Sequence, residues 1–330
     1  MKNFLFISML IALLCCISCK SHKYDNLPAQ IAELCRKIDK NPNNSDLYQQ
    51  RAEYYLEKKQ TDEALADILK AIKLNDKISA YYVTLADIYL VKNETDLVEE
   101  SLQKAIAIDN YNEAYLKLAE LYFYQYMYEE CDETIEKAVR LQNHNPKAYL
   151  TKAMLLKETG DTTGWLRMLQ LVIDQDPQEV IAYTDLAYYF QQQLNPLAIS
   201  YYKNALEITP NDKILNYNLG RLYQDLHEYD LAKEQYENLI AIDPNSYPAY
   251  NSLGYIALNF EENFEEAVRY FSKAIEIDSL YDQAWCNRGI AYEYLKAWDR
   301  ARADFLQCRK INPNNKGAIT ELNRLDAMKK

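Results

Sequence analysis

The chain has 330 residues and carries 37 basic against 49 acidic side chains, a formal net charge of −12 at neutral pH. This acidic balance repels nucleic acids and anionic lipid headgroups, so it argues against a nucleic-acid-binding protein. With 49% hydrophobic residues, 6 Gly and 9 Pro, the composition predicts a folded chain of long helices joined by short turns.

The first residues form a separate segment. Lys2 precedes an apolar stretch, Phe4 to Ser18, which is too short to span a bilayer comfortably and ends in Cys16-Ile17-Ser18-Cys19. The range 1–18 resembles a bacterial lipoprotein signal peptide, in which a small residue precedes a cysteine that is lipidated and becomes the mature N-terminus. This resemblance implies cleavage before Cys19 and lipidation of Cys19. An ordinary signal peptide cut near Ser18 and a marginal membrane anchor are the alternatives.

The residues after the predicted cleavage point are polar. Lys20 stands where lipoproteins kept in the inner membrane often carry aspartate, so the resemblance implies a cell-envelope location at the outer membrane. Residues 19–27 are predicted to be a lipidated tether. The range 28–44 then contains an amphipathic helix that ends at Pro42, with its apolar face formed by Ile31, Leu34, Cys35 and Ile38.

Small residues then recur on a grid with steps of 33 to 35 positions, at Ala64, Ala198, Ala232, Ala267 and Ala301. The remaining grid points hold Val98, Cys131 and Trp165. Such a period predicts a solenoid, because a single unit of this length cannot bury its apolar face alone. Within each period the segments Leu215–Tyr223, Tyr250–Tyr255 and Trp285–Tyr292 place a small residue between large ones. This pattern resembles the tetratricopeptide repeat, a helix–turn–helix unit of 34 residues.

The resemblance implies an all-α, right-handed α-solenoid of about eight repeats over residues 45–315. The predicted repeats are 45–78, 79–111, 112–145, 146–179, 180–212, 213–246, 247–281 and 282–315. The ranges 28–44 and 316–330 are predicted to be capping helices, because a solenoid needs a polar outer face at each end. In the second cap, Ile319, Leu322 and Leu325 are expected on the packed side.

The fourth repeat differs from the others because Trp165 occupies its small grid position. A bulky indole at a close helix crossing pushes the helix pair apart. A locally adapted repeat is one interpretation, and a joint between the first three and the last four repeats is the other.

No motif in the sequence predicts catalysis. Its 3 His residues are not spaced with Cys as zinc ligands, and no phosphate loop, nucleophile elbow or His-Glu-x-x-His is present. The four Cys residues beyond the leader form no Cys-x-x-Cys pair, and Cys131 and Cys308 stand where the repeat needs small buried residues. We therefore expect no enzyme, no metal, no cofactor and no disulfide.

The family resemblance also implies that the first helix of each repeat lines a concave surface where a peptide binds. On that face the first three repeats contribute an acidic set: Glu53, Asp87 and Glu120, with Tyr124. The last four contribute an aromatic and amide set: Tyr188, Tyr217, Asn218, Arg221, Asn251, Tyr255, Asn287 and Tyr294. Amides can serve a peptide backbone as donor and acceptor, and tyrosines add stiff contact area. A merely solvated polar wall is the alternative.

Gln49, Glu53 and Thr84 stand where chaperone-binding family members carry the lysines and asparagines of a carboxylate clamp, so that clamp is not expected. The prediction for function is a lipid-anchored scaffold in a cell-envelope assembly, which holds a protein or peptide segment in this groove. The alternative is a peptidoglycan- or polysaccharide-binding lipoprotein, because aromatic rings and amides also suit sugars. Most of the 30 tyrosines, however, are expected to pack between helices.

Overall fold

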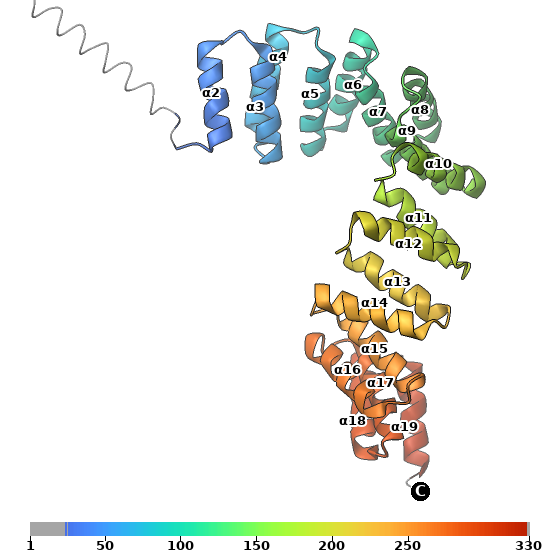
Figure 1. The fold of residues 1–330 in the computed structure, drawn as a ribbon. Helices are drawn as coiled ribbons and strands as arrows, with labels where there is room; N and C mark the ends of the chain where they lie inside the picture. The colour runs from blue at the N-terminus through green and yellow to red at the C-terminus, as the bar shows by residue number, and fades with distance from the viewer. Residues whose placement is uncertain (1–23, 25, 329–330) are drawn as a thin grey trace, which may run out of the picture. The chain divides into compact units, whose positions relative to one another are not determined.

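The computed structural model describes residue 24 and residues 26–328. This part of the chain forms eighteen α-helices, α2 to α19, and no β-strand (Figure 1). The all-α prediction is confirmed. The helices fall into two compact units, with the division between Leu171 and Val172. The predicted signal peptide and Cys19 lie outside the described residues.

In the first unit each helix from α2 to α8 packs against the next one along the chain. Its helices are α2 (Ala29–Lys40), α3 (Ser45–Glu57), α4 (Thr61–Leu74), α5 (Ser79–Val91), α6 (Thr95–Asp109), α7 (Asn112–Tyr124), α8 (Tyr128–Leu141), α9 (Pro146–Thr159) and most of α10 (Thr162–Gln175).

In the second unit every helix likewise packs against its successor. Its helices are α11 (Val180–Gln191), α12 (Leu197–Ile208), α13 (Lys213–Asp225), α14 (Tyr229–Ile242), α15 (Tyr247–Asn259), α16 (Phe264–Ile277), α17 (Asp282–Tyr294), α18 (Trp298–Ile311) and α19 (Lys316–Met328). Each predicted repeat range therefore holds two consecutive helices, and the limits of the repeats stay a prediction.

The small residues lie where the two helices of a pair cross. A Cβ built on Gly220, Gly254 or Gly289 would meet a ring carbon of the paired helix at 2.8, 2.6 and 2.6 Å. The rings belong to Tyr236, Phe271 and Phe305, and all three are fully buried. These crossings therefore need glycine, because any side chain would overlap an aromatic ring that has no room to move.

Several turns within the pairs share one backbone conformation, a residue with left-handed φ just after the first helix. Lys59, Asn93 and Lys296 adopt left-handed φ angles of 60°, 60° and 58° just after α3, α5 and α17. After α3, the Gln60 amide donates to the Tyr55 carbonyl at 2.8 Å, and the Lys59 amide donates to the Leu56 carbonyl at 2.9 Å. This is the Schellman pattern, which satisfies the last carbonyls of a helix and reverses the chain.

The two terminal helices bury an apolar face against the repeat beside them. In α2 the buried side chains are Ile31, Ala32, Leu34, Cys35 and Ile38, which include every residue predicted for that face. In α19 they are Ala318, Leu322 and Leu325. The prediction for Ile319 is wrong, because this side chain is 36% exposed. Leu322 and Leu325 are buried as predicted, and the small Ala318 takes the place expected for Ile319.

Trp165 is buried in α10, with 7% of its surface exposed. The Lys157 ammonium of α9 lies 4.9 Å from the centroid of its ring. The Trp165 indole is therefore packed between helices and makes a cation–π contact with the Lys157 ammonium. The hypothesis of a joint at this repeat stays a prediction.

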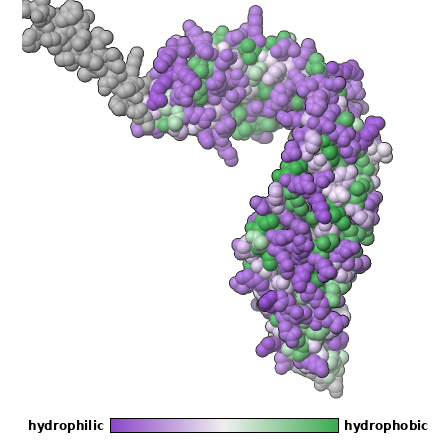
Figure 2. Space-filling view, viewed as in Figure 1, coloured by the Kyte–Doolittle hydropathy of each residue, from purple (hydrophilic) through white to green (hydrophobic). Residues whose placement is uncertain are grey.

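Hydrophilic side chains cover much of the visible surface of either unit, with apolar patches between them (Figure 2). Several exposed apolar side chains lie in or beside the turns within pairs, such as Tyr126 after α7 and Trp298, the first residue of α18. No helix of the described part has both the length and the hydrophobicity needed to cross a bilayer.

Candidate functional site

A polar hollow of about 420 Å³ lies in the second unit, on the first helices of three successive repeats. Its lining comes from four helices: from α13 Tyr217, Arg221, Gln224 and Asp225, from α14 Tyr236, from α15 Asn251, Ser252 and Tyr255, and from α17 and the residue before it Tyr281, Gln283 and Asn287. Helices of neighbouring repeats build this wall together because each repeat stacks its first helix beside the next.

Two amides form the centre of the wall. The Asn287 Nδ2 donates a hydrogen bond of 3.0 Å to the Asn251 Oδ1. Asn251 is buried, with 7% of its surface exposed, and Asn287 is half-buried. Neither amide has a second hydrogen bond within residues 26–328, so the pair keeps one donor group and one acceptor for a ligand.

Tyrosines flank the amides. The Tyr217 ring lies 5.8 Å from the Tyr236 ring, and the Tyr281 ring lies 4.9 Å from that of Tyr247. Burial raises the pKa of Tyr281 to about 12, so its hydroxyl is protonated at neutral pH. Tyr255 is 38% exposed and offers the most accessible ring of the hollow.

The hollow carries charges of both signs on α13. Arg221 and Asp225 lie one turn apart, and both are exposed. Within the described part of the chain neither residue belongs to a salt bridge or a hydrogen bond. The Arg221 guanidinium is therefore available to an acceptor on a ligand, and a bound carboxylate would satisfy it in two places at once.

Five of the predicted groove residues share this hollow: Tyr217, Arg221, Asn251, Tyr255 and Asn287. Asn218 is half-buried beside them and does not line it. Tyr188 and Tyr294 are 54% and 60% exposed and also lie outside it, and the Tyr294 ring stacks on Phe264 at 4.6 Å.

The sequence analysis missed six of the lining residues: Gln224, Asp225, Tyr236, Ser252, Tyr281 and Gln283. For Gln224 the signal is its place one turn after Arg221, on the same face of α13. Tyr281 precedes its helix, so helical periodicity gives no signal for it.

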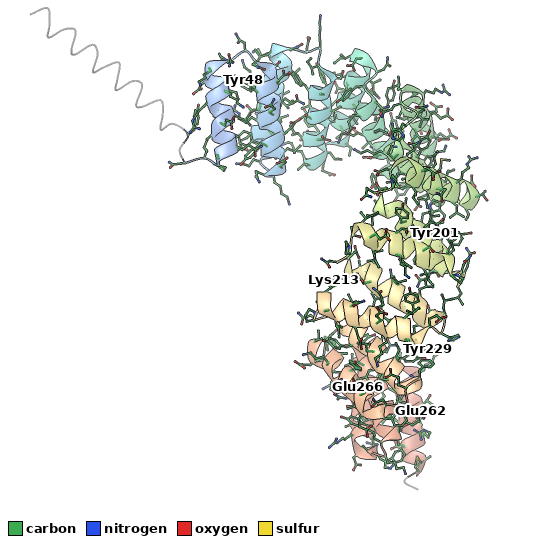
Figure 3. All side chains as sticks on the ribbon, viewed as in Figure 1. Tyr48, Tyr201, Lys213, Tyr229, Glu262 and Glu266 are labelled. Carbon is green, nitrogen blue, oxygen red and sulfur yellow. The ribbon has the colours of Figure 1, made fainter. Side chains whose placement is uncertain are left out.

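Aromatic side chains also stack along the turn edge of the second unit. Tyr229 at the start of α14 (Figure 3) stacks on Phe260, which follows α15, with ring centroids 3.4 Å apart. Phe260 in turn lies 5.9 Å from the Tyr255 ring. Phe260, held by its stacking on Tyr229, therefore helps to fix the position of the Tyr255 ring.

The predicted acidic face in the first unit is partly neutralised. Asp87 of α5 accepts from the Lys117 ammonium of α7 at 2.8 Å. Burial raises the pKa of Glu53 and that of Glu120, and Lys117 opposes this rise at Glu120. The acidic prediction counted the carboxylates without Lys117, so the net charge of this face is less negative than expected.

The remaining predicted residues of the first unit, Glu53 and Tyr124, take no part in the Asp87–Lys117 ion pair. Glu53 lines a smaller hollow of about 300 Å³ between α2 and α3, where Glu33 and Lys37 also lie. Tyr124 is 70% exposed at the end of α7, and its ring packs edge-on against Phe123 at 5.5 Å.

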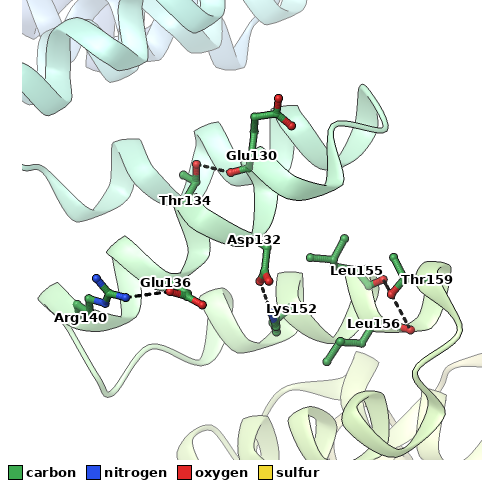
Figure 4. A network of polar contacts seen from close by, with 9 residues as sticks. All are labelled: Glu130, Asp132, Thr134, Glu136, Arg140, Lys152, Leu155, Leu156 and Thr159. Atoms are coloured by element: carbon green, nitrogen blue, oxygen red, sulfur yellow. Dashed lines mark hydrogen bonds and ion pairs between the residues drawn. The ribbon is translucent and has the colours of Figure 1, made fainter.

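The first unit has further ion pairs on α8 and α9, beyond the predicted acidic residues. Lys152 of α9 pairs with Asp132 of α8, while Arg140 and Glu136 pair within α8 at 2.9 Å (Figure 4). No group of three or more His, Cys, Asp or Glu within the described ranges could hold a metal ion.

Helix–turn–helix units stacked in chain order define an α-solenoid repeat protein. Models of the tetratricopeptide repeat match residues 38–66, 113–145, 189–254, 247–279 and 283–315. The chain belongs to the tetratricopeptide-repeat family.

Two similar proteins extend this comparison. The lipoprotein NlpI homolog of Haemophilus influenzae is 34% identical over 93 residues, which are 28% of this chain and 29% of that protein. The match thus spans less than a third of the relative's length. A crystal structure of the C-terminal part of a repeat-containing protein from Cytophaga hutchinsonii covers 72% of this chain and 98% of its own. Its TM-score of 0.62 at 22% identity supports the fold alone.

Proposed function

We propose that this protein is a lipid-anchored scaffold of a bacterial cell envelope that binds an extended segment of a partner protein in the hollow on α13, α15 and α17. The observation that carries the proposal is the amide pair Asn251–Asn287 between accessible tyrosine surface and the Arg221 guanidinium. A peptide backbone alternates donors and acceptors, so the amides can bind it without reading its side chains. Arg221 favours a segment that carries a carboxylate at this point.

Anchoring rests on the sequence before the described residues and on a relative. Ser18-Cys19 follows an apolar segment, and the matched relative from Haemophilus influenzae is named a lipoprotein. Each methylene of an attached acyl chain contributes about 0.8 kcal/mol of membrane affinity, so more than one chain on Cys19 would hold the protein stably. Lys20 favours the outer membrane over the inner one.

The proposal is tested by affinity capture from detergent-solubilised envelopes, followed by quantitative mass spectrometry. The variant Tyr217→Ala/Tyr255→Ala should lose the specific partners of the wild type, because it removes two rings of the hollow. Tyr188→Ala/Tyr294→Ala is the matched control, since it removes two exposed tyrosines outside the hollow. Identical partner sets from the wild type and the hollow variant would contradict this site.

A Cys19→Ala chain should leave the membrane fraction, and its retention there would contradict the anchor.

A polysaccharide is the second candidate ligand, because hydroxyl and amide groups predominate in the hollow. Sugars stack on flat, exposed aromatic faces, whereas Tyr236 is fully buried and Tyr217 is half-buried. Only Tyr255 of the three offers much free surface, so the geometry favours a peptide. Retention on purified peptidoglycan that is lost in Tyr255→Ala would reverse this preference.

A further inference from the structure

Two cysteines lie close together in the core of the last repeat. Cys286 of α17 and Cys308 of α18 belong to one buried cluster with Phe305 and Leu322. Cys308 is fully buried, and Cys286 keeps 8% of its surface exposed. Neither thiol takes part in the proposed binding site.

The register of the helix pair brings the two thiols together. The pair crosses where Gly289 meets the Phe305 ring, and a three-residue turn joins α17 to α18 so that they run antiparallel. Three residues before Gly289 is Cys286, and three residues after Phe305 is Cys308. The cysteines therefore lie opposite each other, one turn from the closest approach of the two backbones.

The same register in the neighbouring repeats shows that a thiol pair is special to the last one. In α15 and α16 the equivalent positions hold Asn251 and Ala274, and in α13 and α14 they hold Tyr217 and Leu239. The packing of a repeat thus needs no cysteine at either position.

The start of α19 covers the cysteine that is the more exposed of the two. A Cβ built on Gly317 would lie 3.2 Å from the Cys286 Sγ, so this glycine leaves room for the sulfur. The neighbouring Cys308 side chain lowers the pKa of Cys286, and the Cys286 side chain together with burial raises the pKa of Cys308. Because Cys286 keeps 8% of its surface exposed and Cys308 none, Cys286 is the thiol that a reagent reaches first.

We propose that Cys286 and Cys308 form a disulfide bond in the folded protein when it meets a disulfide oxidant, tying α17 to α18. The bond would add a covalent link to the helix pair that precedes α19. The prediction of no disulfide rested on the absence of Cys-x-x-Cys pairs and on the small buried positions of Cys131 and Cys308, and it did not compare cysteines across a helix pair.

The oxidant is a disulfide, either of a small molecule or of a thiol–disulfide oxidoreductase. Cys286 loses its proton and attacks one sulfur of the oxidant, whose S–S bond breaks and releases the first thiol. Cys308 then loses its proton and attacks the Cys286 sulfur of the mixed disulfide, which releases the second thiol. The pair gives up two electrons and two protons, and the oxidant is reduced to two thiols. Export, which belongs to the proposed function, would supply such an oxidant, but the chemistry of the pair does not depend on it.

The test uses the purified, reduced, folded full-length protein and oxidised glutathione. After acid quench, denaturation and alkylation, peptide mapping reports the state of each cysteine. We expect a cross-linked peptide joining Cys286 to Cys308, lighter by ~2 Da than the sum of the two reduced peptides. Cys35 and Cys131, also buried and free, should remain alkylated and serve as internal references.

Other outcomes overturn the proposal. Alkylation of Cys286 and Cys308 to the same extent as Cys35 would do so, as would separate glutathione adducts on both without a cross-link. A bond that forms only in urea would also do so, because it would belong to the unfolded chain. In the variant Cys308→Ala no second thiol can resolve the mixed disulfide, so we expect a stable glutathione adduct on Cys286. This adduct would show that glutathione reaches Cys286 in the folded protein. Loss of partner capture by the hollow variants is a different readout, so the two proposals fail independently.

Discussion

Gly254 shows how one absent carbon sets the spacing of a helix pair. A Cβ at this position of α15 would lie 2.6 Å from a ring carbon of Phe271 on α16. The first unit builds the equivalent crossing with Ala86 and Leu102, which share a buried cluster. In these two crossings a larger residue on one helix is thus matched by a smaller one on the other.

Gly254→Ala should lower the free energy of unfolding of the second unit by about 1–3 kcal/mol, because the buried Phe271 ring cannot retreat from the new methyl group. The midpoint of urea unfolding measures the effect. The double variant Gly254→Ala/Phe271→Leu copies the pairing of Ala86 with Leu102 and should recover much of the loss. A single variant as stable as the wild type would show that the crossing is looser than the structure has it.

At the scale of elements, one buried ion pair joins three helices of the second unit. Arg288 of α17 donates from its Nε and one terminal nitrogen to the Asp304 carboxylate of α18, at 2.7 and 2.9 Å. Its remaining terminal nitrogen donates to the Ser272 hydroxyl of α16 at 3.0 Å. The charges are compensated by a bidentate contact, and this compensation makes their burial tolerable.

The same arrangement recurs at the other end of the chain. Arg51 of α3 binds the Asp67 carboxylate of α4 at 2.6 and 2.7 Å, and its third contact is the Cys35 Sγ of α2 at 3.3 Å. Cys35 precedes Arg51 by the same 16 residues that separate Ser272 from Arg288. The helix α2 therefore takes the part of the second helix of a preceding repeat, which explains why it caps the first unit.

Arg288→Met should destabilise the second unit by about 3–5 kcal/mol, because the Asp304 carboxylate stays buried without its partner. The double variant Arg288→Met/Asp304→Leu removes both charges and should regain most of the loss. Chemical unfolding of the wild type, the single variant and the double variant measures this cycle. If the double variant were as unstable as the single one, lost packing rather than an unpaired charge would be the cause.

The turns mark the limit of what the sequence predicts at this scale. The existence and pairing of the helices follow from the period of the small residues, because that period fixes where helices cross. Lys59 and Lys296 gave no such signal, since no glycine or asparagine announces their left-handed φ, whereas Asn93 belongs to a residue type that often adopts it. Hydrogen bonds to the last carbonyls of the preceding helix stabilise that conformation, and a lysine side chain does not announce them.

The candidate site was predicted to a similar degree. Repeat register identifies the face of the first helices, and five residues on that face do line the hollow. Its depth depends on how three helices sit side by side, so Tyr281, which precedes its helix, could not be found from periodicity. On the acidic face, Lys117 was missed because only its ion pair with Asp87 across helices reveals its effect on charge.

At the scale of the whole molecule, stability is built from contacts between neighbours. Within each unit the helices pack against those next to them along the chain, and the largest buried clusters hold residues of adjacent repeats. A solenoid of this kind has no single central core, so local damage weakens the nearest repeats first. The helix α19 is a sensitive place to test this, because it packs mainly against α18, with further contacts to α17 at Gly317 and Arg324.

Leu322→Ala should expose this nearest-neighbour coupling. Leu322 is 3% exposed in the cluster with Phe305 and Cys308, so the truncation should cost about 2–5 kcal/mol locally. Hydrogen exchange read by mass spectrometry should show the largest loss of protection in α18 and α19, a smaller loss in α17, and none by α11. Ile319→Ala on the same helix is the matched control, because Ile319 is 36% exposed and its loss should change little. A uniform loss of protection from α11 to α19 would mean that the second unit unfolds as one cooperative body, against the additive picture of stacked repeats.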